Sequence, residues 1–536
     1  MEEIEDQLGK DQSGEDSPIP FGIRGDTGEF FPALDAASIE AFAAGAPAEI
    51  EAQLRPYFAL RQTEAAPTRG LVGTIRDSDS LASTGWGAIF GASAGADVRE
   101  ALKLLLDHRC TEVAWDPDAY LRRWRVKSQP LYQEFAGAAA PTAGEAAKAW
   151  LWRTGKIALN PVNPRLGVPY YILIVAPPAE ISFEFQYSLD LYWAVGRIWF
   201  ENPDGTPNLD EFRRYAASVV AWESLADSEI STSRQMAVFA PCRPFDEATQ
   251  AFSRLVAQTI ATGADGVPPA GVECDFAIRD FIGPAATKAN LTRIWNGEIP
   301  GGPPALLFSG GHGVWFPPDK PLDWFPPDQP ADNANLQGAL VCQDRKPGPI
   351  QPDQMFAASD VDSLRPGAMH GMIHFMFACY GGGWPAFDTY TAGQGRTPVS
   401  LAGGPRLSRL PQKLLAHPGG GALAVIAHID KAWGYSFRRG DVPQLQGFSD
   451  VIARLMAGDR VGQATDEFNK RWAVLSSELL NELDKSGGKP VNPQLLGNLW
   501  IGRDDARNYI VIGDPAVRLR PEAMPILPAS DDTSTS

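Results

Sequence analysis

The sequence predicts an α/β protein with a mostly parallel sheet flanked by helices, preceded by an α-rich N-terminal accessory region. From about residue 166, apolar runs of strand length alternate with helical patterns, which is typical of parallel sheets. Two of the runs end in small-residue turns that contain a histidine and a cysteine. Reactive side chains at the carboxyl ends of strands are what an open α/β sheet favours.

Length and composition set the expected organisation. The chain has 536 residues, 44% of them hydrophobic and 21% charged, so we expect a globular protein with more than one structural unit. The predicted parts are an acidic flexible tail (1–20), an accessory domain (21–165), the main domain (166–525, with a further division near 298) and a disordered tail (526–536).

The charge and hydropathy of the chain exclude some classes of protein. Its net charge is −18, which argues against a nucleic-acid partner, because nucleic-acid binders present basic surfaces. The first residues are acidic and contain no apolar segment of signal-peptide length. No apolar run is long enough to span a membrane. We therefore expect a cytoplasmic protein without a membrane span.

The strands are expected where apolar, β-branched and aromatic residues form short runs between turn residues. In chain order these runs are 71–75, 86–90, 170–175, 235–240, 276–281, 306–309, 338–342, 373–378, 422–427 and 509–512.

The helices are expected where apolar residues recur three and four positions apart, as Val98, Leu102 and Leu105 do. In chain order these segments are 36–44, 48–60, 97–107, 144–152, 245–261, 285–295, 407–416, 448–456 and 461–480. Residues 315–330 are too rich in proline and tryptophan for regular structure, so they predict a loop beside the histidine turn.

The two strand-end turns indicate nucleophilic catalysis. The first follows 305–309 and reads Gly310-Gly311-His312-Gly313, and the second follows 372–377 and contains Cys379 before three glycines. A thiolate is a strong nucleophile, and a nearby imidazole can serve as its base. Flanking glycines let main-chain N–H groups approach a carbonyl oxygen closely. A buried structural cysteine has no need of such a turn.

At these residues the chain resembles the caspase-like clan of cysteine peptidases. The clan has a strand ending in His-Gly and a later strand ending in Ala-Cys-x-Gly, which here are His312-Gly313 and 378–381, in the same order. Segments 283–289, 419–425 and 512–519 are similar to further parts of gingipain and CHAT domains. The gingipain-like branch fits better than true caspases, because Phe377 stands where caspases have glutamine.

The resemblance implies a fold and a set of roles. It implies a cysteine endopeptidase that acts on protein or peptide substrates without a cofactor. Cys379 would attack the carbonyl carbon, His312 would protonate the leaving amine, and the N–H groups of Gly313 and Cys379 would bind the oxyanion. An activating partner that binds the N-terminal region is a further expectation.

The substrate pocket is predicted less directly. Asp430 and Trp433 follow the strand after the cysteine, and the Trp-Gly pair resembles the aromatic wall of the gingipain pocket. Asp430 could face a basic residue on the acyl side of the cleaved bond (the P1 residue), or it could be a solvated loop charge.

Two other functions are open from the sequence. The chain could be a catalytically silent caspase-like scaffold that binds partners, although it retains both Cys379 and His312. It could also be a serine hydrolase, because 91–95 matches G-x-S-x-G around Ser93. A chance match in a glycine-rich chain explains that motif equally well.

Metal chemistry is not expected. His370 and His374 are four residues apart, but the surrounding pattern predicts entry into a strand rather than a helix. The five cysteines contain no Cys-x-x-Cys pair. His374 is expected in the core, beneath the cysteine turn.

Overall fold

The structure is a computed structural model. It describes residues 19–32, 71, 77–113, 130–155, 161–264, 266–317, 322, 333–388, 390, 401, 404–439, 442–485 and 492–527. The helices expected at 36–44 and 48–60 and most of the strand expected at 71–75 lie outside these residues.

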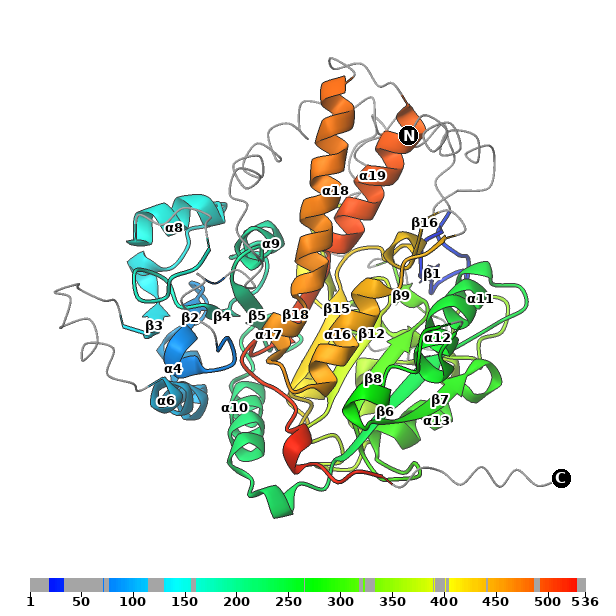
Figure 1. Cartoon of the computed structure of the whole chain (residues 1–536), viewed down its shortest axis with the longest axis horizontal. Coiled ribbons are helices and arrows are strands. Elements are labelled where there is room, and N and C mark those ends of the chain that lie inside the picture. The colour runs from blue at the N-terminus through cyan, green and yellow to red at the C-terminus, as the bar shows by residue number, and fades with distance from the viewer. Residues whose placement is uncertain are drawn as a thin grey trace.

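A ten-stranded sheet forms the centre of the molecule (Figure 1). Its strands, in spatial order, are β3 (Tyr132–Phe135), β2 (Trp86–Phe90), β4 (Tyr171–Val175), β5 (Ala194–Ile198), β18 (Tyr509–Gly513), β15 (Ala424–His428), β12 (Ile373–Phe377), β8 (Pro304–Gly310), β6 (Ser233–Ala240) and β7 (Ala277–Ile282). Every neighbouring pair is parallel except β15 and β18. The sheet therefore consists of two parallel halves that run in opposite directions.

Helices flank this sheet. In the first part of the chain they are α4 (Leu81–Thr84), α5 (Ala96–Ala101), α6 (Lys103–Glu112), α8 (Ala147–Gly155), α9 (Phe183–Asp190) and α10 (Leu209–Ser224). In the middle they are α11 (Glu247–Phe252), α12 (Gln258–Thr262), α13 (Lys288–Trp295), α14 (Ala358–Val361) and α15 (Arg409–Leu415). The last are α16 (Gln446–Met456), α17 (Val461–Ala464), α18 (Asp466–Lys485) and α19 (Pro493–Arg507).

The long helices α18 and α19 lie side by side and project beyond the sheet (Figure 1). They bury a separate cluster that includes Leu479, Leu480 and Leu499. This cluster explains why the pair holds together where it is no longer covered by the sheet.

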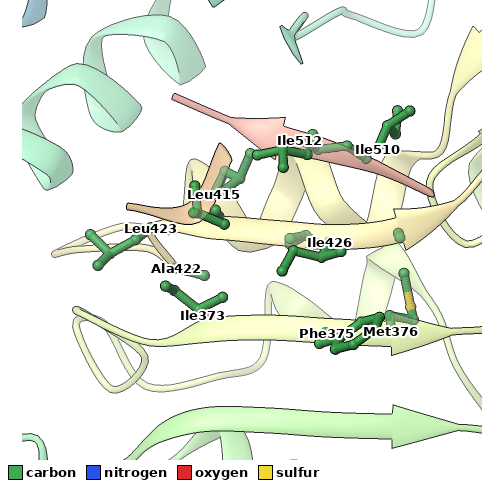
Figure 2. Close-up of a cluster of buried hydrophobic side chains, with 14 of the residues drawn as sticks. Ile373, Phe375, Met376, Leu415, Ala422, Leu423, Ile426, Ile510 and Ile512 are labelled. Carbon is green, nitrogen blue, oxygen red and sulfur yellow. The ribbon is translucent and has the colours of Figure 1, made fainter. Parts of the chain in front are cut away.

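The main hydrophobic core covers the sheet. Figure 2 shows side chains of β12, β15 and β18 in one cluster with Leu415 and Leu423. The strands of this cluster are buried along their whole length, as expected for central strands covered on both faces. Continuous apolar runs, rather than alternating ones, are therefore what the sequence shows here.

A second, smaller sheet lies beside the first. It joins β1 (Gly22–Arg24), β9 (Gly313–Trp315), β10 (Leu340–Val341) and β11 (Met355–Phe356) in that order. β1 pairs in parallel with β9, so a segment near the N-terminus lies next to the histidine turn (Figure 1). Two antiparallel pairs complete the strands of the described residues: β13 (Gly383–Trp384) with β14 (Arg406–Leu407), and β16 (Arg438–Arg439) with β17 (Val442–Pro443).

The predicted fold class is confirmed: the chain is α/β with a large, mostly parallel sheet flanked by helices. The predicted domain boundaries stay predictions, but none of them coincides with a break in the sheet. Strands β2 and β3 belong to the predicted accessory region and extend the same sheet. One half of the sheet contains the strands up to Ile198 together with the late strand β18, and the other half contains the strands from Ser233 to His428.

No helix within the described ranges combines the length and apolar character that a membrane crossing requires.

Asp514, which follows the last strand β18, binds side chains of β2 and α6. Its buried carboxylate accepts hydrogen bonds from Trp86 Nε1 at 2.9 Å and from Arg109 Nε at 2.7 Å. The Arg109 side chain is fully buried and also binds Glu223. Removing one member of such a network leaves buried charge without its partner.

We predict that Asp514→Ala lowers the free energy of unfolding by about 3–5 kcal/mol, because Arg109 then loses a buried ion-pair partner. Denaturant unfolding followed by tryptophan fluorescence measures this loss. Asp210→Ala is the matched control, since Asp210 forms an exposed pair with Arg213 at 2.6 Å and should cost less than about 1 kcal/mol. Equal effects of both substitutions would contradict the role of the buried network.

Candidate functional site

The histidine turn continues directly from β8. Gly311 N–H donates to the carbonyl of Phe377 at 3.1 Å, which ties this turn to the end of β12. The His312 side chain that follows is buried. Its Nε2 lies 2.9 Å from Asp246 Oδ1. Within the described part of the chain, its Nδ1 has no hydrogen-bond partner. One ring nitrogen is therefore held, and the other is available.

Asp246 is a site residue that the sequence analysis missed. It lies after β6, at the start of α11, where its carboxylate also accepts from Arg243 Nη1 at 2.9 Å and from Thr249 N–H at 3.2 Å. Burial opposes ionisation, but the charge and hydrogen bond of His312, together with Arg243, hold the pKa of Asp246 well below its usual range. Asp246 follows the carboxyl end of β6, which is the parallel neighbour of β8. This position in the sequence was the signal that could have placed Asp246 near His312.

Cys379 lies beyond the end of β12 and is fully buried. Its Sγ accepts a hydrogen bond from the Ala432 N–H at 3.2 Å. Burial raises the pKa of this thiol far above its ordinary value, although the Ala432 hydrogen bond acts in the opposite direction. In this conformation of the protein the sulfur is covered, and its burial favours the protonated form.

The N–H groups of Gly313 and Cys379 converge on a single oxygen. Both donate to the carbonyl of Phe21, at 3.1 Å from Gly313 and 3.2 Å from Cys379. A side chain at position 313 would overlap the Cys379 carbonyl oxygen. Glycine is therefore required there for the close approach of the two turns. These are the two donors that the sequence analysis named for an oxyanion.

The thiol lies beside the peptide unit that joins Phe21 to Gly22, and the imidazole lies beside the Phe21 ring. A Cβ placed on Gly22 would lie 3.1 Å from Cys379 Sγ. The rings of Phe21 and His312 are 5.8 Å apart between centroids. The structure thus places a thiol and two main-chain N–H donors around one amide bond, with an imidazole beside the adjoining Phe21 side chain.

Asp430 and Trp433 lie in the segment that follows β15, next to Ala432, whose N–H binds the Cys379 sulfur. Asp430 is buried, with φ +67°, and its carboxylate accepts from the N–H of Lys431 at 2.8 Å. Trp433 packs on Tyr390, with ring centroids 4.9 Å apart. Its backbone N–H donates to Asp505 at 2.8 Å. Of the two alternatives open for Asp430, its burial argues against a solvated loop charge.

His370 and His374, the two histidines considered as metal ligands, bind different protein groups. His374 lies on β12 and its Nε2 is 2.8 Å from Ser309 Oγ, and burial lowers its pKa to about 3. His370 binds the carbonyl of Ser218 at 2.9 Å. His374 therefore occupies the core beneath the cysteine turn.

One group among the described residues has the spacing of metal ligands, namely His108, Glu112 and Glu223. The guanidinium of Arg109 forms ion pairs with both glutamates. A guanidinium of the protein itself therefore already binds both of these carboxylates.

Ser93 has the strand–turn–helix setting of a nucleophile elbow but not its partners. It lies between β2 and α5 and is exposed. Both its hydroxyl and its N–H donate to Glu180, and no histidine is among its hydrogen-bond partners in the described chain. Because β2 belongs to the half of the sheet that runs the other way, Ser93 lies at the edge opposite Cys379. The geometry does not support a serine hydrolase at Ser93.

No protein-family model matches the chain, and no curated protein matches it. A solved structure named "Structure of Protease" is similar over 83% of this chain and 79% of its own, with 12% identity and a TM-score of 0.46. Similarity at that level does not define a function, so the assignment below depends on the geometry of the site.

We predict that iodoacetamide modifies Cys110 well before Cys379 in the native full-length protein. Cys110 is exposed, whereas Cys379 is fully buried and burial raises its pKa. Because the thiolate is the reacting form, both effects slow alkylation of Cys379. Peptide mass spectrometry after timed labelling measures the order. Rapid labelling of Cys379 would show that the thiol is uncovered in solution.

Proposed function

We propose that the chain is a cysteine peptidase of the caspase-like clan that hydrolyses peptide bonds in protein or peptide substrates. One observation supports this most directly. The N–H groups of Gly313 and Cys379 bind one peptide carbonyl oxygen beside the Cys379 thiol. Pairs of main-chain donors aimed at a carbonyl oxygen are the means by which acyl-transfer enzymes stabilise the oxyanion.

The roles follow from the contacts of each group. Cys379 Sγ attacks the carbonyl carbon, and the oxyanion stays on the two N–H groups. His312 delivers a proton to the leaving amine through Nδ1, since its Nε2 is bound to Asp246. Asp246 keeps the imidazole in this orientation and stabilises its charged form.

The alternative of a silent scaffold is less well supported. A scaffold gains nothing from a buried Asp246–His312 pair next to a thiol, because buried charges are costly to desolvate. The assignment to the gingipain-like branch, the cytoplasmic location and the activating partner stay predictions. The preference for a basic P1 residue stays a prediction as well.

We predict that Cys379→Ala abolishes peptide hydrolysis without loss of folding, and that His312→Ala slows it by about 10²–10⁴-fold, because an acid–base group is lost. Hydrolysis of a fluorogenic peptide library measures activity, and thermal unfolding measures folding. Cys110→Ala is the matched control and should keep full activity. A folded Cys379→Ala protein with normal activity would end the assignment.

We predict that Asp246→Asn slows hydrolysis by about 10²–10⁴-fold, because the amide no longer stabilises a protonated imidazole. The pKa of Asp246 is held well below its usual range, so its carboxylate is charged throughout the neutral range. The loss should therefore persist across the neutral pH range when kcat is measured. An activity equal to wild type in a folded variant would exclude Asp246 from the mechanism.

A further inference from the structure

The segment before β1 lies in the site as an extended strand. Gly434 N–H donates to the Ile19 carbonyl at 3.1 Å, and Phe21 N–H donates to the Ala432 carbonyl at 2.9 Å. Pro20 pairs with Trp433 in antiparallel fashion between these two bonds. Adding an extended peptide to a free edge is a common way to bind a peptide ligand. Residues 19–21 are thus bound through their main chain, whatever their side chains.

This strand places one particular bond at the thiol. The Phe21 carbonyl oxygen accepts from Gly313 and Cys379, at 3.1 and 3.2 Å. A side chain on Gly22 would overlap the Phe31 ring and approach Cys379 Sγ to 3.1 Å. Glycine on the amine side therefore lets the sulfur reach the Phe21–Gly22 bond.

The Phe21 side chain fills an aromatic pocket. It is 1% exposed. Its ring centroid lies 4.8 Å from Phe377, 5.7 Å from Phe437 and 6.1 Å from Phe252, each in an edge-to-face arrangement. Edge-to-face packing of this kind favours another aromatic ring. A lysine side chain at the same place would bury its ammonium group among aromatic rings. Burying an unpaired charge is unfavourable, so such a lysine would have to lose its proton or stay out of the pocket.

The two sides of the bond are held differently. Gly22 begins β1, which pairs with β9 over Gly22–Arg24, and the Gly22 carbonyl accepts from Phe31 N–H at 3.0 Å. Among the described residues, the segment before the bond contacts the protein through the strand along 432–434 and the Phe21 pocket. Cleavage of the Phe21–Gly22 bond would leave β1 paired in its sheet. The segment that ends at Phe21 could then dissociate.

We propose that the Phe21–Gly22 bond is a substrate of the chain's own Cys379, and that the Phe21 pocket selects an aromatic P1 residue in other substrates as well. This proposal rests on the proposed peptidase function. Until the bond is cut, the N-terminal segment blocks the site for any other peptide.

The reaction balances with water alone. Cys379 Sγ bonds to the Phe21 carbonyl carbon, and the C–N bond to Gly22 breaks. The thiol proton passes through His312 to the amine of Gly22, which becomes the new N-terminus. Water then adds its hydroxide to the thioester carbonyl carbon, the C–S bond breaks, and the sulfur takes the other proton. Residues 1–21 leave as the carboxylic acid at Phe21, whose proton passes to the new amine of Gly22. Because burial raises the pKa of Cys379, we expect this self-cleavage to be slow. It occurs once in each molecule, since each chain has a single Phe21–Gly22 bond.

The test follows the intact mass and the N-terminus of purified full-length protein over time. We expect wild type to lose residues 1–21 and to gain an N-terminus at Gly22, while Cys379→Ala stays whole. The rate should not depend on protein concentration, because the bond already occupies the site. Cys379→Ala protein mixed with wild type should be cut far more slowly.

Phe21→Lys tests the pocket. We expect cleavage after position 21 to slow at least about 100-fold, because the ammonium must enter an aromatic site. Phe387→Lys is the matched control: Phe387 is 53% exposed, and cleavage after Phe21 should be unchanged. Equal or faster cleavage of Phe21→Lys would overturn the aromatic preference and restore the basic one.

Peptide hydrolysis separates the two proposals. Short peptides with phenylalanine or lysine at P1 are offered to wild type and to Phe21→Lys, whose pocket is no longer filled by phenylalanine. Hydrolysis of a peptide by either protein without cleavage at Phe21 in wild type would overturn self-cleavage and leave the peptidase assignment intact. No hydrolysis of any peptide and no self-cleavage would overturn both.

Discussion

The common direction of β6, β8, β12 and β15 is the constraint on which the site depends. Because these neighbours are parallel, their carboxyl ends lie at one edge of the sheet, and the residues that follow them meet there. That edge receives Asp246, His312, Cys379 and the strand around Ala432, from four separate parts of the chain. Because β15 and β18 are antiparallel, the strands of the other half of the sheet end at the opposite edge, and Ser93 lies there.

The same geometry that would stabilise an oxyanion also binds the N-terminal segment. The Phe21 carbonyl satisfies two main-chain donors that would otherwise be buried without a partner, a state that proteins avoid. Filling the pocket with Phe21 also keeps water from the aromatic rings around it. Burial raises the pKa of the Cys379 thiol, and the segment around Gly22 contributes to that burial, so accessibility of the site and the chemistry of the thiol are linked.

The sequence analysis recovered the elements whose signals are local. The strands at β8, β12, β15 and β18 are continuous apolar runs, which central covered strands produce. It missed β5, because Arg197 interrupts the run. In the structure Arg197 is buried, donates to Gln186 at 2.8 Å and to the Ala176 carbonyl at 3.1 Å, and burial lowers its pKa to about 9. A charged side chain with distant partners cannot be distinguished from an exposed one by periodicity alone.

By itself, the sequence determined the α/β class and the two turns with His312 and Cys379, because strand length, turn glycines and the reactive residues are adjacent in the chain. Only the tertiary structure decided that Asp246 binds His312, that Asp430 belongs to a buried turn, and that Phe21 occupies the site. These contacts join residues far apart in sequence, and their energies come from burial and directional hydrogen bonds. Such terms exist only once the sheet has brought the segments together.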